Sequence, residues 1–142
     1  RHARAVELTL AGKTDLASKE FDSIAAKDLS AEELNNICWS KALANVALDR
    51  ALEECDRSLA KDNGFAARDS KAVVLLRQSK FDEAIVQFDL ALEDGEVPAA
   101  LYGRSLAYAR KGDRVKSDAD AARALKLAPG IDRTYDYYGL TR

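Results

Sequence analysis

The sequence predicts an all-α protein built as an array of antiparallel helix pairs. In the stretch from Phe81 to Leu92, the residues Ala84, Phe88 and Ala91 follow one another at offsets of four and three, which places them on one helical face. Small residues recur at one position of this pattern with separations of 34, 33 and 33 residues, namely Ala17, Ala51, Ala84 and Ser117. A period near 34 residues is typical of stacked helix–turn–helix units, so we expect one repeat domain over residues 1–142.

Turns and breakers divide this domain into units. Residues 1–30 form a degenerate first repeat, in which a break at Gly12 is followed by a helical stripe of Leu16, Ala17, Phe21 and Ile24. Three full repeats and a terminal helix follow at residues 31–64, 65–97, 98–130 and 131–142. We expect the terminal helix to act as a cap, because the end of a repeat array needs a solvent-compatible outer side.

The first full repeat begins with a capping box. Ser30 and Glu33 can each accept a hydrogen bond from the other's backbone N–H, which starts a helix that runs to about Ala44. A turn at residues 45–47 leads into a second helix that ends before Gly64, a residue suited to a left-handed helix end. The inner positions of this pair are Leu34, Cys38, Ala42, Ala51, Cys55 and Leu59.

The next two repeats carry the same alternation of helices and turns. A helix from about Ala66 to Gln78 precedes the Phe81 stretch. Pro98 starts the following helix, because its missing N–H costs little in a first turn. The expected inner positions of these two first helices are Ala72, Leu75, Leu76, Leu101, Ser105 and Tyr108.

The Pro129-Gly130 pair stops the last second helix and separates it from the terminal one. Beyond this breaker, Ile131, Tyr135 and Tyr138 share one helical face, while Tyr137 points outward. We expect this face to cover the apolar side of the last repeat, including Leu125.

Composition argues against several functional classes. The net charge is −2 without a basic stripe, so we expect no nucleic-acid partner. No apolar run approaches the length of a membrane span or a signal peptide, so we expect no membrane insertion. The sequence contains no methionine, which suggests a mature or excised piece of a longer product.

The few residues suited to catalysis or metal binding are scattered. His2 is the single histidine, and the two cysteines do not form a CxxC pair, so we expect no metal, no cofactor and no catalytic activity. Cys38 and Cys55 lie on facing helices of one hairpin, where they could form a bond in an oxidising compartment. We favour two buried thiols that act as small apolar residues.

The repeat pattern resembles that of the tetratricopeptide repeat family. The last full unit matches through Leu101, Ser105, Tyr108, Gly112, Ser117, Ala124, Leu125 and Pro129. The middle unit matches through Ala72, Leu75, Phe81, Ala84, Phe88, Ala91 and Leu92, and the preceding unit through Ala42, Leu48, Ala51 and Leu59. Three residues depart from the family pattern: Trp39 replaces a small residue, Arg104 an apolar one and Glu96 a proline.

The resemblance implies a right-handed superhelix whose first helices line a concave groove that receives peptides. Carried over by position, the groove residues are Asn36, Ser40, Asp69, Val73, Arg77, Tyr102, Leu106 and Arg110. One variety of the family grips a C-terminal carboxylate with Lys and Asn, but Asp69 would repel such a group.

Two functions therefore stand as hypotheses. The first is a protein–protein interaction scaffold that binds a segment of a partner protein or peptide in the concave groove. The alternative is a non-catalytic recruiting or regulatory domain of a larger enzyme. Self-association through the edges of the array stays open under either hypothesis.

Overall fold

A computed structural model describes residues 4, 7–8, 11–13, 15–17, 19–20 and 28–142. The described chain is all-helical and contains no strand. Its helices are α3 (Ala31–Ala44), α4 (Leu48–Lys61), α5 (Phe65–Arg77), α6 (Phe81–Ala91), α7 (Pro98–Lys111), α8 (Arg114–Leu127) and α9 (Ile131–Tyr137). The prediction of an all-α protein is therefore confirmed, with most helix ends close to the turns read from the sequence. The left-handed end expected at Gly64 is wrong: Gly64 has an extended backbone at φ −84° and precedes α5, while α4 ends at Lys61.

Local chemistry fixes several helix ends. The N–H of Glu33 donates to Ser30 Oγ at 3.1 Å, and the N–H of Ser30 donates to Glu33 Oε2 at 3.3 Å, which completes the predicted capping box of α3. The carboxylate of Asp113 caps α8 by accepting from the N–H of Lys116 at 3.1 Å. Gly112 ends α7 at φ 88°, a left-handed conformation that a glycine adopts without a Cβ clash.

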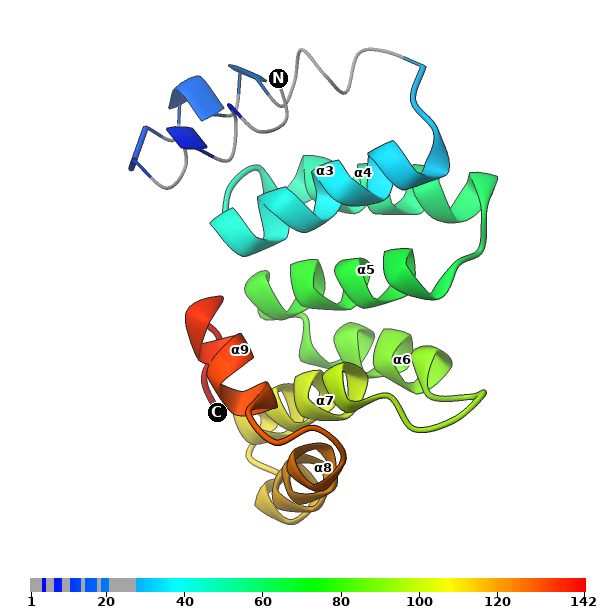
Figure 1. Ribbon diagram of the computed structural model, residues 1–142, viewed down its shortest axis with the longest axis vertical. Helices are drawn as coiled ribbons and strands as arrows, with labels where there is room; N and C mark the ends of the chain where they lie inside the picture. The colour runs from blue at the N-terminus through cyan, green and yellow to red at the C-terminus, as the bar shows by residue number, and fades with distance from the viewer. Residues whose placement is uncertain (1–3, 5–6, 9–10, 14, 18, 21–27) are drawn as a thin grey trace.

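The helices pack as three consecutive hairpins. α3 packs against α4, α5 against α6 and α7 against α8, and the first helices also touch one another, α3 against α5 and α5 against α7 (Figure 1). α4 contacts α5 and α6 contacts α7, so each hairpin is joined to the next through both of its helices. The C-terminal helix α9 returns to the side of α7, beside the first helices.

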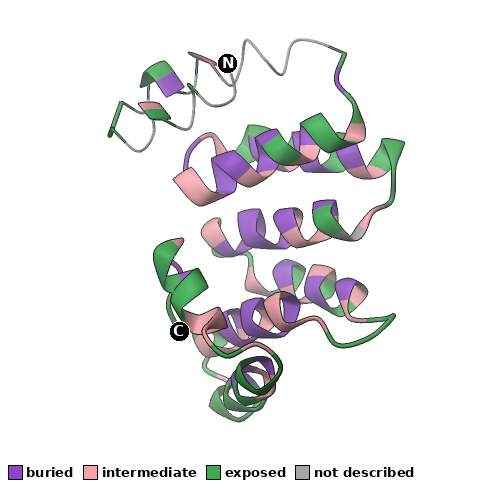
Figure 2. Ribbon diagram, in the orientation of Figure 1, coloured by how far each residue is buried: buried purple, intermediate pink, exposed green. Residues whose placement is uncertain are grey.

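The core lies in the seams between these helices (Figure 2). The regularly spaced small residues Ala51, Ala84 and Ser117 are fully buried there, as the sequence predicted. α6 and α7 approach each other closely at Gly103, where an added Cβ would clash with the buried ring of Phe88. A small residue in one helix therefore makes room for a large side chain from the next.

The cysteines correct an expectation. We favoured two buried thiols, but Cys38 and Cys55 form a disulfide between α3 and α4, with their Cα atoms 5.5 Å apart. Both residues are fully buried, so the bond lies inside the seam of the first hairpin. The sequence correctly placed them on facing helices, and that placement is what permits the bond.

Near the N-terminus, Ala17 is fully buried. It belongs to a small apolar cluster with Leu29, Leu34, Ile37 and Val46, which attaches it to the first hairpin. Phe21 and Ile24, the other large residues of the predicted stripe, lie outside the described residues, as does His2. The described helices include none that is long and apolar enough to cross a membrane.

Candidate binding face

The C-terminal segment lies against one side of the first helices. We call this side the first-helix face and define it by Trp39 of α3, Asp69 and Arg77 of α5, and Tyr102 and Arg110 of α7. Contacts from α9 and the residues after it reach four of these side chains directly, through rings or hydrogen bonds. The face therefore gathers residues from all three hairpins under one segment.

Two tyrosines anchor this segment. Tyr135 is 2% exposed; its hydroxyl donates to the carbonyl of Ala99 at 2.6 Å, and its ring lies 5.0 Å from the Tyr102 ring. The ring of Tyr138 stands edge-on to Trp39 at 5.4 Å, a favourable aromatic arrangement. Tyr137 is 85% exposed, so the predicted division of the three tyrosines is confirmed.

Two arginines hold backbone carbonyls at the same place. Arg77 donates from Nε to the carbonyl of Ala42 at 3.0 Å and from Nη2 to that of Leu43 at 3.2 Å, and it also donates to the Tyr138 carbonyl. Arg110 donates to the carbonyl of Thr141 at 3.2 Å. Burial lowers the pKa of Arg77. The two guanidinium groups thus join the end of α3 and the C-terminal segment to the first-helix face.

Asp69 is the poorly matched group of the face. Its Oδ1 atom is buried and has no hydrogen-bond partner. Burial raises the pKa of this carboxyl from 3.8 to about 6. The Asp69 charge acts on Tyr135 and Tyr138: burial is the main cause that raises the pKa of each phenol, and the Asp69 charge adds to the increase. A buried acceptor without a donor destabilises the arrangement that contains it.

The structure distributes the eight predicted groove residues unevenly. Asn36 and Arg110 are exposed, and Asp69 and Arg77 are partly buried. The remaining four are buried, namely Ser40, Val73, Tyr102 and Leu106. Arg77, Tyr102 and Arg110 contact the C-terminal segment, and the Asp69 charge acts on its tyrosines. The full burial of Val73 leaves it no surface for a ligand. Their role in binding stays a prediction.

Sequence reasoning missed Trp39 as a member of this face. It registered only as a departure from a small residue, yet it is partly buried and meets Tyr138. The terminal helix also differs from the expected cap in one respect, because Leu125 stays 37% exposed in its presence. The reason is that α9 turns its tyrosines toward Trp39 and Tyr102, across the first helices.

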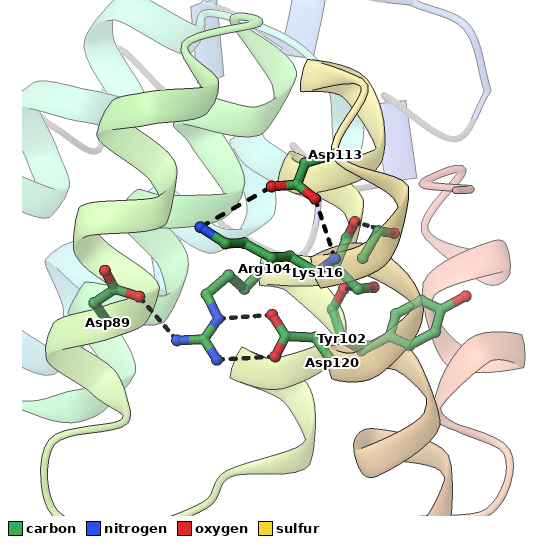
Figure 3. Close-up of polar contacts among 8 residues, drawn as sticks. Asp89, Tyr102, Arg104, Asp113, Lys116 and Asp120 are labelled. Atoms are coloured by element: carbon green, nitrogen blue, oxygen red, sulfur yellow. Dashed lines mark hydrogen bonds and ion pairs between the residues drawn. The ribbon is translucent and has the colours of Figure 1, made fainter.

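A separate charged cluster explains why Arg104 replaces an apolar residue. Its guanidinium donates two hydrogen bonds to Asp120 of α8, at 2.7 and 2.9 Å, and one to Asp89 of α6 at 2.9 Å (Figure 3). The Asp120 hydrogen bond is the main cause that raises the pKa of Arg104. Arg104 and Lys116 also lie 6.0 and 5.4 Å from the centre of the Tyr108 ring. These groups join α6, α7 and α8 and have a structural role.

The hollows of the surface give little further support to the first-helix face as a binding site. A cavity of about 150 Å³ remains between Arg77, Arg110 and residues 139–141, at the edge of the first-helix face. Two wider hollows, of about 510 and 530 Å³, lie near the loops and contain none of the predicted groove residues. Within the described part of the chain, no group of three His, Cys, Asp or Glu side chains is placed to hold a metal ion.

Comparison of the sequence with protein-family models and with curated proteins finds no match. The likeness to tetratricopeptide repeats therefore rests on the residues and spacing of this chain. Function has to be inferred from the first-helix face itself and from the segment that lies on it.

Proposed function

We propose that this chain is a tetratricopeptide-like α-solenoid, a right-handed superhelical array that serves as a protein–protein interaction scaffold. Its concave groove is the first-helix face, and its ligand is a short segment of a partner protein. One observation carries the proposal: the chain's own C-terminal segment occupies this face through aromatic side chains and backbone carbonyls. A segment of a partner protein also carries aromatic side chains and backbone carbonyls.

The arrangement of the hairpins supports the solenoid. The small residues that repeat every 33 or 34 positions are buried in equivalent seams, and each first helix stacks on the next. Repetition of one hairpin with neighbour-only contacts creates an extended surface that spans several repeats. The first-helix face has this property, because α3, α5 and α7 all contribute to it.

The chemistry of the face supports a protein ligand. Trp39, Tyr102 and the two arginines belong to the residue types that most often carry interface energy. Their helices are held by packed seams and by a disulfide, so little ordering of the receptor has to accompany binding. A preformed face with aromatic and guanidinium groups suits a helical segment in a groove.

The test begins with affinity capture on the full chain, followed by calorimetry with the identified partner. Arg110→Ala and Asn36→Ala change exposed residues of first helices, and Glu83→Ala on α6 provides an exposed control on a second helix. We expect Arg110→Ala to weaken binding by about 1–2 kcal/mol and Glu83→Ala to leave affinity unchanged. Tyr102 is a poor choice for this test, because it is 5% exposed and its loss would disturb the core.

Helical content measured by circular dichroism controls for unfolding of each variant. If Glu83→Ala weakens the partner while Arg110→Ala and Asn36→Ala bind like the parent, the binding surface is on the second helices and the proposed site is wrong.

A further inference from the structure

The segment on the first-helix face fits it incompletely. α9 has seven residues, fewer than an isolated helix needs to be stable in water, so its position depends on its contacts with the face. Those contacts leave Asp69 Oδ1 buried without a hydrogen-bond partner. The two acids of α9 that act on Tyr102, Asp132 and Asp136, cannot pair with Asp69. The cation that acts on Tyr102 from the same segment, Arg142, is paired with Asp118. The resident segment thus satisfies the aromatic part of the face and leaves its acidic part unmatched.

We propose that the partner segment is a short helix that carries two aromatic or planar side chains three residues apart, as α9 does, together with a basic side chain that pairs with Asp69. This inference rests on the proposed function and names the chemistry of its ligand. Binding displaces α9, whose contacts occupy the same surface.

The spacing follows from the resident tyrosines. Tyr135 and Tyr138 are three residues apart and both turn toward the first helices, where they meet Tyr102 and Trp39. Side chains at positions i and i+3 lie on the same face of a helix, whereas an extended segment would point them to opposite sides. A helical ligand therefore reproduces both contacts.

The basic group follows from Asp69. Asp69 lies on α5, the helix whose Arg77 donates to the Tyr138 carbonyl, and its Oδ1 atom is buried without a hydrogen-bond partner. Its charge also adds to the raised pKa of the Tyr135 and Tyr138 phenols, after burial. An arginine in place of Tyr138 would bring a planar cation to the Trp39 ring and donors to Asp69 Oδ1. Such a pair removes the polar defect that the resident segment leaves.

The test uses three fluorescent peptides that copy residues 128–142: the parent sequence, the same peptide with Tyr138→Arg, and a neutral control with Tyr138→Gln. The receptor is the full chain in which Tyr138→Ala weakens the resident segment, with and without Asp69→Asn. Tyr135 is kept because it is 2% exposed and its loss would disturb the core. Fluorescence anisotropy gives the dissociation constant of each peptide for each receptor, and circular dichroism checks that both receptors are helical.

We expect Asp69→Asn to weaken binding of the Tyr138→Arg peptide at least about tenfold, because it removes one partner of a partly buried charge pair. The parent and Tyr138→Gln peptides should bind the Asp69→Asn receptor as well as they bind the other, or better. If Tyr138→Ala unfolds the receptor, the peptides are measured on the parent full chain, with and without Asp69→Asn. Within each receptor the resident segment lowers the three affinities by the same factor, so the ratio between the Tyr138→Arg and Tyr138→Gln peptides is the quantity compared.

Three results overturn the inference. In the first, Asp69→Asn changes the three affinities equally. In the second, the parent peptide binds the receptor with Asp69 most tightly, which would assign the face to the C-terminal segment of a second copy. In the third, no peptide binds, although Arg110→Ala still weakens a captured partner; the proposed function then survives and the ligand chemistry fails. A captured partner that ignores the first-helix face would instead refute the proposed function.

Discussion

The seams between paired helices and the first-helix face treat buried acids differently. In the first hairpin, Glu54 lies 2.6 Å from the ammonium group of Lys41, and both side chains are at most 4% exposed. In the third hairpin, Asp120 receives two hydrogen bonds from Arg104. On the first-helix face, Asp69 pairs with no cation among the described residues, and its Oδ1 atom is buried without a hydrogen-bond partner. Glu54 also keeps one buried oxygen, Oε2, outside its hydrogen bond with Lys41, so the paired cation is what distinguishes the two acids.

This difference separates stability from function. Glu54 and Asp120 are 66 residues apart, twice the 33-residue separation of neighbouring units, so they occupy the same position of two repeats. Each is matched by a cation from the facing helix of its own hairpin. Asp69 has no such cation within the described part of the chain, and local polar defects of this kind are expected at functional sites. Loss of a cation from a seam should therefore destabilise the protein, whereas neutralising Asp69 on the first-helix face should stabilise it.

The largest effect should come from Lys41→Met. The substitution removes a fully buried ammonium group from the side of Glu54, whose side chain is 4% exposed. A buried carboxylate that loses its cation costs about 3–5 kcal/mol, so we expect the free energy of unfolding to fall by that amount. Chemical denaturation monitored by circular dichroism measures it.

The double substitution Lys41→Met with Glu54→Gln supplies the control. Removing both charges should restore much of the loss, because the penalty belongs to the remaining charge more than to the lost contact. If the double variant is no more stable than Lys41→Met alone, the unpaired Glu54 charge is not the cause of the loss.

The second effect concerns the other cross-link of the same seam. Replacing Cys38 and Cys55 together by alanine opens a disulfide that joins residues 17 positions apart. A loop of this length predicts a loss of about 3 kcal/mol, to which the smaller alanine side chains add. The melting temperature of the double variant measures the loss. Addition of a reducing agent should lower the parent's stability and leave that of the variant unchanged.

The third effect has the opposite sign and lies on the first-helix face. The folded-state pKa of Asp69, about 6, is above its ordinary value of 3.8, so its contribution to stability is present below pH 4 and is lost as the pH rises through 6. Tyr135 and Tyr138 stay neutral over this range, because their pKa values are raised above 10. At pH 8 we therefore expect Asp69→Asn to stabilise the protein by about 2 kcal/mol.

Unfolding curves of the parent and of Asp69→Asn between pH 4 and 8 test this expectation. The gap between the two variants should widen with increasing pH. A constant gap, or a larger gap at pH 4, would show that the carboxylate is not destabilised on this face.

The smallest effect should be that of Arg104→Lys. Lysine keeps the positive charge but cannot form the two parallel hydrogen bonds with Asp120 or hold Asp89 with a third. Because the Arg104 side chain is 23% exposed, water replaces part of what is lost, and we expect a decrease of about 1 kcal/mol. Arg104→Met, which removes the charge as well, should cost more in the same denaturation experiment.

The features that could be predicted from the sequence are those that local patterns of residues determine. The helices, their turns and the buried seam residues follow from the spacing of Ala51, Ala84 and Ser117 and from caps such as Ser30. These features depend on residues within one or two turns of each other, or on a repeat that copies one hairpin. They can therefore be predicted without knowledge of any tertiary contact.

The contacts that could not be predicted from the sequence join parts of the chain that are far apart in sequence. Arg77 reaches the carbonyl of Tyr138 over 61 positions, and no local period encodes such a meeting. The burial of Asp69 Oδ1 without a hydrogen-bond partner likewise depends on how the helices and the C-terminal segment pack. The disulfide required a choice between two chemical states of Cys38 and Cys55, which their placement on facing helices allows but does not decide.

Trp39 gives the molecule an intrinsic optical reporter. It is the single tryptophan of the chain, and its indole ring is in edge contact with Tyr138 of the C-terminal segment. The emission wavelength of an indole depends on the polarity around it, so departure of the segment would admit water and shift the emission to the red. Rapid-mixing fluorescence could then time the exchange between resident segment and partner without any attached dye.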